Sequence, residues 1–439
     1  MKNRANLKEF ARYTSLNVLG MIGLSCYILA DTYFVALGLG TNGLAALNLA
    51  IPVYSLILAC GLMLGMGGAT KYTILKSQND LKKANRAFTG TVFMALFFSI
   101  AFFAVGLFLS ESIAATLGAD KDVFDMCRTY LRVLLLFSPL FIFNNIFLCF
   151  VRNDGAPQLS MLAMVAGSLS NIVLDYIFIF PLNMGIFGAV FATGLAPVIS
   201  LLILSTFLIQ GKNSFHLEKA AVSVRTAMDI LSCGVPSLIT ELATGVVMMT
   251  FNFITMRLSG NTGVAAYGVI ANIAIVAVSI FSGVAQGIQP ILSRLYGIGD
   301  RPALAATLRY ALTTIEALST GIYVLIFFFA DPIAAAFNSQ QDAQMQQLAV
   351  TGLRIYFISC VFEGFNILVS AYFAATECVR PAYFISLLRG FFIILPTVFL
   401  LSSFLGMTGV WCAPPVAEAI VGLIALIIYR TKQSCTTNR

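Results

Sequence analysis

Six acidic residues stand inside long apolar stretches of this 439-residue chain, and they are the residues best placed to do chemistry. An ionisable side chain at membrane depth is costly, so each one is a candidate for ion or substrate handling. The six are Asp31, Asp175, Glu241, Glu316, Glu363 and Glu418.

Four polar side chains of the first half are expected to meet at one depth. At 1.5 Å per helical residue, Asp31 lies about 8 Å below the end of the first apolar stretch, and Asp175 lies at a similar depth in the fifth. Asn171 precedes Asp175 by one turn on the same face, and Thr193 lies about 12 Å into the sixth stretch. Two carboxylates, an amide oxygen and a hydroxyl suit a small hard cation such as Na+, and a close carboxyl pair can also hold a proton. These four residues are therefore predicted to bind a coupling cation or proton, the alternative being hydrogen bonds that only join helices.

The elements that must position these residues are membrane-spanning helices. Apolar residues make up 59% of the chain and charged residues 10%, with a mean hydropathy of +0.91, which is too little charge for a soluble protein of this length. The apolar runs are continuous, which favours helices over the alternating strands of a barrel. Twelve runs are long enough to cross a bilayer, for which about 20 residues are needed. They lie at 14–36, 44–70, 87–110, 130–151, 157–180, 185–210, 230–257, 262–290, 304–329, 350–375, 382–404 and 408–430.

The basic residues predict the orientation of these spans. Twelve spans put both termini on one side, and twenty of the 26 Lys and Arg residues fall in segments on that side. Five fall on the opposite side, and Arg389 falls within a span. The positive-inside rule therefore predicts a multi-pass protein of the cell inner membrane with both termini in the cytoplasm. The net charge of +7 follows from these clusters, so no nucleic-acid partner is expected.

The two halves of the chain are related by an internal repeat. Gly40-Thr-Asn-Gly-Leu-Ala-Ala46 returns as Gly260-Asn-Thr-Gly-Val-Ala-Ala266, and two further pairs of segments recur at offsets of 221 and 222. Six spans return the chain to its starting side, so the halves should be parallel repeats. We expect an amino-terminal lobe (1–210), a polar cytoplasmic linker (211–229) and a carboxy-terminal lobe (230–439).

The predicted cation site is not part of the repeat. At offsets of 220–221, its four residues correspond to Phe251, Phe392, Pro396 and Pro414. The second half has its own acids nearer the middle of the membrane. Glu241 and Glu363 are expected to face a central cavity, as a substrate site or a second proton site. For Glu316 and Glu418 the choice between a cavity role and packing stays open.

Several segments give the chain a resemblance to the multidrug and toxic compound extrusion (MATE) family. The resemblance covers almost the whole chain, and it rests on the order and spacing of its segments. They are Ala30-Asp-Thr-Tyr-Phe34, Gly43-Leu-Ala-Ala46, Val151-Arg-Asn-Asp-Gly-Ala-Pro157, Ser170-Asn-Ile-Val-Leu-Asp175, Met184-Gly-Ile-Phe-Gly-Ala189, and Ala285-Gln-Gly-Ile-Gln-Pro290 with Tyr296-Gly297.

The resemblance implies a V-shaped pair of six-helix bundles that exports compounds in exchange for Na+ or H+. It also implies that Asp31, Asn171, Asp175 and Thr193 form the cation or proton site of the amino-terminal lobe. Some members are thought to bend the first span at a proline. This sequence has Gly20 and Gly23 there and no proline, so that detail is not carried over.

Together these features predict a monomeric secondary antiporter for amphipathic, cationic compounds, in which two lobes rock about a central cavity. No enzyme or cofactor is expected, because Walker, HExxH and GxSxG motifs are missing from the sequence and its nine cysteines have no metal-like spacing. One alternative is a flippase for lipid-linked or polysaccharide precursors, which should have a larger, basic cavity. A more remote alternative is an intramembrane aspartyl enzyme, which should carry a GxGD-like signature.

Overall fold

The chain folds into helices throughout most of its length and crosses the membrane twelve times. The computed structural model describes residues 2–219, 223–338 and 341–437. Within these ranges eight helices are long and apolar enough to cross a membrane, and two bent helix pairs each make one further span. Two of the eight, α1 and α8, have 76 and 74 residues, and each folds back at a glycine to make two spans. The predicted all-α fold with twelve transmembrane helices is confirmed.

The helices follow one another in two similar series. The first series is α1 (Lys2–Ser77), α2 (Leu81–Phe108), α3 (Ser110–Thr116), α4 (Phe124–Leu136), α5 (Ser138–Asn153), α6 (Pro157–Ile179) and α7 (Gly185–Ile209). The second series is α8 (Val224–Gly297), α9 (Arg301–Phe337), α10 (Ala343–Tyr356), α11 (Ser359–Ala375), α12 (Val379–Leu387), the π-helical turn η1 (Leu388–Phe392), α13 (Ile394–Leu405) and α14 (Met407–Thr437).

The same backbone features recur at matching places in the two series. Helix α1 turns back at Gly40 (φ 66°, ψ −156°), and α8 turns back at Gly260 (φ 58°, ψ −147°). Such dihedral angles are essentially restricted to glycine. The pairs α4–α5 and α10–α11 are both bent by 47°. The repeat predicted from the sequence is therefore a structural repeat.

The two glycine turns lead to a stability prediction. Gly40→Ala and Gly260→Ala should each lower the free energy of unfolding by about 1–3 kcal/mol, because alanine is strained in this conformation. Gly268→Ala is a matched control, since a Cβ there would meet no neighbouring heavy atom within 4 Å and the residue has no positive φ. Thermal unfolding of the purified variants in detergent measures the difference. Equal melting temperatures for all three variants would show that the turns do not need glycine.

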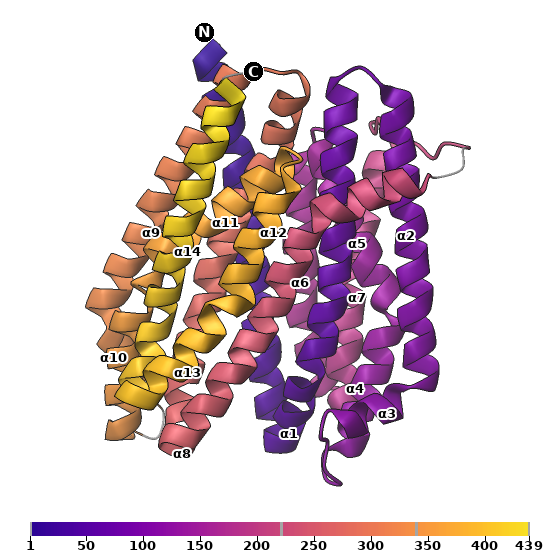
Figure 1. The fold of residues 1–439 in the computed structure, drawn as a ribbon. Helices are drawn as coiled ribbons and strands as arrows, with labels where there is room; N and C mark the ends of the chain where they lie inside the picture. Colours follow the sequence, from indigo (N-terminus) through magenta and orange to yellow (C-terminus); the bar gives the residue numbers. More distant parts are fainter. Residues whose placement is uncertain (1, 220–222, 339–340, 438–439) are drawn as a thin grey trace.

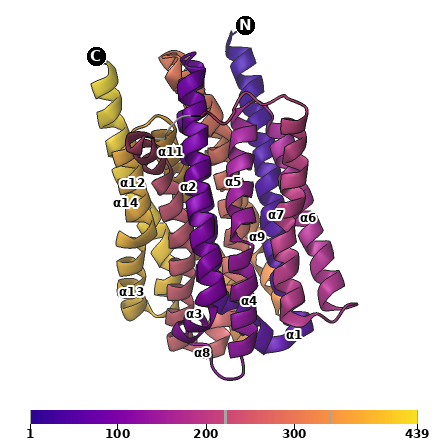
Figure 2. The same cartoon turned by 90° about the vertical axis from the view of Figure 1, so that its right-hand side faces the viewer.

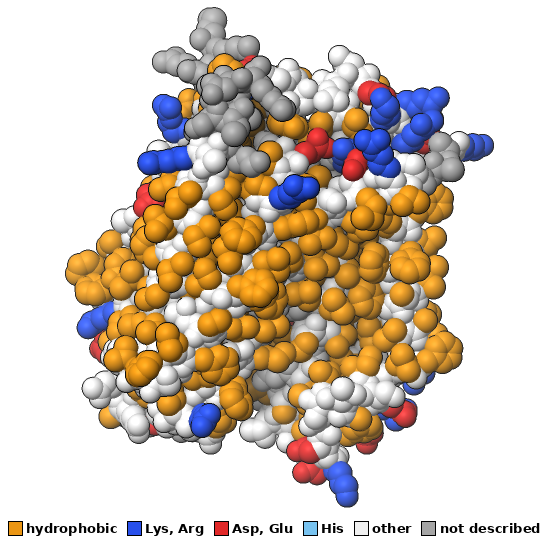
Figure 3. Space-filling model, viewed as in Figure 1, with side chains coloured by type: hydrophobic (Ala, Val, Ile, Leu, Met, Phe, Trp, Pro, Cys, Tyr) orange, Lys and Arg blue, Asp and Glu red, His pale blue; other side chains and the backbone are white. Residues whose placement is uncertain are grey.

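The two series form two bundles that stand side by side (Figure 1). Both chain termini lie at one end of the molecule, which we name the termini end, and the turns at Gly40 and Gly260 define the glycine-turn end. The view turned by 90° shows most helices running lengthwise between these ends (Figure 2). A broad apolar band covers the middle of the visible face, and basic side chains gather mainly at the termini end (Figure 3). This band matches the hydrocarbon layer of a bilayer.

The bundles contact each other most closely in the half of the molecule nearer the termini end. A Cβ on Gly234 of α8 would lie 1.9 Å from the carbonyl oxygen of Met63 of α1. A Cβ on Gly67 would lie 2.1 Å from the carbonyl oxygen of Ile230. Both distances are far below van der Waals contact, so the two backbones meet only because these residues are glycines.

Polar contacts between the bundles lie in the same region. The side chain of Asn17 donates to the carbonyl oxygen of Gly283 at 2.9 Å, and that of Gln289 donates to the hydroxyl of Thr70 at 2.8 Å. Arg294 and Glu9 form an ion pair at 2.7 Å. The bundles are thus closed against each other at the termini end.

Part of the segment predicted as a polar linker is helical. Helix α8 begins at Val224, so residues 224–229 are helical, whereas residues 220–222 lie outside the described part of the chain. Phe215 is only 1% exposed and packs on Phe88 and Phe150 of the first bundle. The stretch therefore covers an aromatic cluster, which its polar composition hid. The short helix α3 was also not anticipated.

Candidate functional site

A buried carboxyl pair lies in the first bundle. Asp31 is on the first span of α1 and Asp175 is on α6, and their side-chain carboxyl groups are within hydrogen-bonding distance of each other. Asp175 is fully buried and Asp31 is 8% exposed. Among the described residues, the Oδ1 atom of each has no hydrogen-bond partner. The pair therefore presents two acceptor oxygens that a proton or a cation can use.

Asn171 and Thr193 complete the set that the sequence placed at this depth. The side-chain NH2 group of Asn171 donates to Asp175 Oδ2 at 3.0 Å, and its oxygen accepts from the backbone N–H of Thr193 at 3.2 Å. The Thr193 hydroxyl donates to the carbonyl oxygen of Ala189 on its own helix, at 3.1 Å. The structure thus brings all four residues together from α1, α6 and α7.

Three tyrosines around this pair were missed at the sequence level. Tyr130 on α4 is buried close to both aspartates and to the side chain of Thr193. Tyr27 lies one helical turn before Asp31, and its hydroxyl is 2.5 Å from the hydroxyl of Tyr54 on the second span of α1. Tyrosines in apolar runs resemble ordinary packing residues, and only the four-residue spacing of Tyr27 and Asp31 pointed to this cluster.

Two adjoining pockets lie between the bundles, with about 820 and 990 Å³ of empty space. The larger one, named the first pocket, is lined mainly by the first bundle, and Thr193, Tyr27 and Tyr54 are part of its wall. The other, the second pocket, is lined mainly by the second bundle. Glu241 lines both pockets. Of the four residues predicted to bind a cation, Thr193 therefore borders the first pocket.

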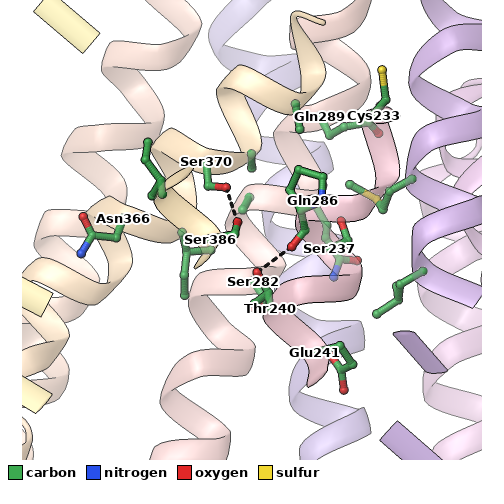
Figure 4. Close-up of a pocket in the computed structure, with 18 of the residues that line it drawn as sticks. Cys233, Ser237, Thr240, Glu241, Ser282, Gln286, Gln289, Asn366, Ser370 and Ser386 are labelled. Carbon is green, nitrogen blue, oxygen red and sulfur yellow. Dashed lines mark hydrogen bonds between the residues drawn. The ribbon is translucent and has the colours of Figure 1, made fainter. Parts of the chain in front are cut away.

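The second pocket is rich in hydroxyl and amide groups. Figure 4 shows Glu241 at one end of it and Cys233 with Gln289 at the other. Its wall also contains the hydrogen-bonded hydroxyls of Ser370 and Ser386, 2.9 Å apart. The surroundings of Glu241 are thus partly polar and partly apolar, which suits an amphipathic molecule.

Glu363 and Glu418 do not face the pockets as free carboxylates. Arg389, on the π-helical turn η1, forms ion pairs with both of them. Glu418 also accepts a hydrogen bond from the amide of Asn366 at 2.7 Å. Glu363 was expected to face the cavity, but it lines neither described pocket, because Arg389 lies beside it.

Glu316 has a different position from the other acids. Its side chain is exposed on α9 and lines neither of the two described pockets. Depth along a helix placed it near the middle of the membrane, but depth does not say which way a side chain points. We assign it no part in the site.

Comparison with known proteins agrees with this architecture. The sequence profile of the MatE family matches residues 18–177 and 236–414, one range in each bundle. Multidrug export protein MepA of Staphylococcus saprophyticus is 24% identical over 416 residues, covering 94% of this chain and 91% of that protein. MepA of Staphylococcus aureus strain MSSA476 is also 24% identical, over 98% of this chain and 95% of that protein.

Solved structures give the same result. A MATE family transporter in an outward-facing conformation superposes with a TM-score of 0.93 at 25% identity, over 99% of this chain and 97% of that one. A MATE protein in a straight conformation gives a TM-score of 0.92 at 25% identity, over 99% and 97% of the two chains.

Two six-helix bundles with pockets between them define a membrane transporter of the two-lobed, twelve-span class. The profile match covers most of both bundles, and this chain belongs to the MatE family. The family expected from the sequence motifs is therefore confirmed.

Proposed function

We propose that this protein is a secondary antiporter that exports amphipathic, cationic organic compounds in exchange for Na+ or H+. The observation that carries the proposal is the Asp31–Asp175 pair. Its two carboxyl groups lie beside each other, and their Oδ1 atoms have no hydrogen-bond partner within the described residues. Two adjacent carboxylates repel each other unless a proton or a cation lies between them. The pair is thus suited to take up and release one positive charge.

The ligand set accommodates either ion. For Na+ the oxygen donors are Asp31, Asp175 and the hydroxyl groups of Thr193 and Tyr130, with Asn171 holding Asp175 in place. For H+ the two carboxyl groups are sufficient. When an ion occupies the site, the packing of α1, α6 and α7 should change. The wall of the first pocket, which contains Thr193, should change with it.

The arrangement of the bundles supports alternating access. Contacts close the termini end, where most basic residues gather, so under the positive-inside rule this end faces the cytoplasm of the cell inner membrane. The conformation is then closed to the cytoplasm. In the proposed cycle, residues 1–210 and 230–439 rock as two units of one monomer, joined by the segment 211–229.

Glu241 is the proposed anchor for the positive charge of the substrate, with a second proton role as the alternative. It borders both pockets, and within the described residues no ion pair involves it. Glu241→Gln should raise the KM for tetraphenylphosphonium about tenfold, the effect of losing one charge-assisted contact. Ser282→Ala, a neutral change in the same two walls, should leave KM nearly unchanged. An equal KM for Glu241→Gln and the wild type would exclude the anchor.

The flippase alternative is less well supported by the charges of the pockets. A pyrophosphate headgroup needs several free basic groups, whereas the pockets contain two arginines and Arg389 is paired with two glutamates. Of these two arginines, Arg152 has no carboxylate partner among the described residues, but it already donates to Asn17 at 2.6 Å.

A direct test uses everted membrane vesicles that contain the protein. They should accumulate tetraphenylphosphonium when energised, and gramicidin, which collapses Na+ and H+ gradients, should release it. Accumulation that persists after gramicidin would exclude an ion-driven antiporter.

A further inference from the structure

The cluster formed by Glu363, Arg389 and Glu418 has the composition of an occupied cation site. Arg389 Nε donates to Glu418 Oε1 at 2.7 Å, and Arg389 Nη2 donates to Glu363 Oε1. The side chains are 14% (Arg389), 14% (Glu363) and 11% (Glu418) exposed. Two carboxyl groups face one guanidinium, so the cluster holds one carboxyl group more than a simple ion pair needs.

A further acceptor lies beside the two glutamates. Asn366 is fully buried, and its amide nitrogen donates both to Oε2 and to the backbone oxygen of Glu418. Its side-chain oxygen has no partner within the described residues. Without the guanidinium, the same place would offer carboxylate and amide oxygens, the donors that hard monovalent cations prefer.

The local backbone is specialised at this point. Arg389 lies in the π-helical turn η1, and such turns are frequent at functional sites. The next residue, Gly390, packs tightly on α8, where a Cβ would lie 2.5 Å from Cβ of Ala243. The turn thus holds the guanidinium between α11 and α14, close to the segment that carries Glu241.

The repeat shows what the cluster replaces. At offsets of 221–222, Glu363 corresponds to Phe141, Asn366 to Asn144 and Glu418 to Pro197, and Arg389 corresponds to Gly167 or Ser168. All five of these first-half residues line the first pocket. The charged cluster of the second bundle therefore corresponds to residues that line the first pocket, while Asn366 and Arg389 themselves line the second pocket.

We propose that Glu363, Glu418 and Asn366 form a second cation site, which is filled by the guanidinium of Arg389 instead of a free ion. The tethered charge keeps both carboxylates from free cations and from the substrate. Ion exchange is then confined to the first bundle, and Glu241 is left as the acid available to substrate in the second. The site itself rests on its own geometry, whereas its consequence for ion exchange and substrate rests on the proposed function.

The test empties the site and offers it a free guanidinium. Purified Arg389→Ala, made in an Asp31→Asn/Asp175→Asn background to remove the other candidate site, is melted in detergent with low-millimolar methylguanidinium chloride or choline chloride. Methylguanidinium should raise the melting temperature by at least about 2 °C relative to choline, because it binds the folded state. The parent, whose site is filled, and Arg389→Ala/Glu418→Gln, which lacks one carboxylate, should show no such difference.

A second readout measures Na+ directly. In the same background, Arg389→Gln should gain bound ²²Na+ that the parent and Arg389→Lys lack, because lysine keeps a tethered charge. If Arg389→Ala does not accumulate, Arg389→Gln takes its place in the melting experiment, and methylguanidinium should raise its melting temperature relative to choline in the same way. The proposal is overturned if methylguanidinium does not raise the melting temperature and no ²²Na+ binds to the emptied site. It is also overturned if the parent or the Glu418→Gln variant shows the same effects as the emptied site.

Discussion

Asp31→Asn and Asp175→Asn should each abolish export driven by an ion gradient, while the protein still accumulates in the membrane. Asparagine keeps the size of the side chain but cannot release a proton or neutralise a cation. Coupling between two ligands of one protein typically changes affinity by about 5- to 150-fold. The gradient-dependent part of tetraphenylphosphonium accumulation in everted vesicles should fall by at least that factor.

Asp122→Asn is the matched control for these variants. Asp122 is exposed in the segment between α3 and α4, so its replacement makes the same chemical change away from the pair. It should export like the wild type. Full gradient-driven export by both pair variants would refute the assignment of this site.

Gly234→Ala should disturb the closed state of the termini end. The added Cβ would lie 1.9 Å from the carbonyl oxygen of Met63, a backbone atom that cannot rotate away. Overpacking of this kind costs about 1–3 kcal/mol, which corresponds to about a 5- to 150-fold shift between two states. Export should fall by a similar factor, because the closed state becomes rare.

Cys233 reports the same change structurally. It is 4% exposed beside Gly234 and lines the second pocket. A membrane-impermeant maleimide added from the cytoplasmic side should label it faster in Gly234→Ala than in the wild type, as located by peptide mass spectrometry. Gly268→Ala should behave as the wild type. Unchanged labelling and export in Gly234→Ala would contradict closure of the termini end.

Much of the architecture could be predicted from the sequence, because its signals are local or repeated. Continuous apolar runs gave the twelve spans, and the recurrence of Gly40 as Gly260 marked the backbone turns of both halves. Depth along a helix also placed Asp31, Asn171, Asp175 and Thr193 together, since rise per residue is nearly constant.

The remaining features depend on how each helix is rotated about its axis. Depth alone could not distinguish Glu316, which is exposed on α9, from Glu418, which is paired inside the bundle. Arg389 was recognised within a span, but its two partners could not be predicted. They lie on other helices, and the direction of the Arg389 side chain is set by the irregular turn η1. Phe215 lies outside any helix, and its place in the aromatic cluster was hidden because the residues around it in the sequence are polar.

In the proposed mechanism, a cation taken up at the Asp31–Asp175 pair drives export. The most direct measurement is tetraphenylphosphonium transport by proteoliposomes in which a Na+ gradient and a pH gradient are imposed separately. We predict that one of the two gradients drives transport against the substrate gradient in the wild type and not in Asp31→Asn. Transport that is indifferent to both gradients, or equally coupled in Asp31→Asn, would contradict this mechanism.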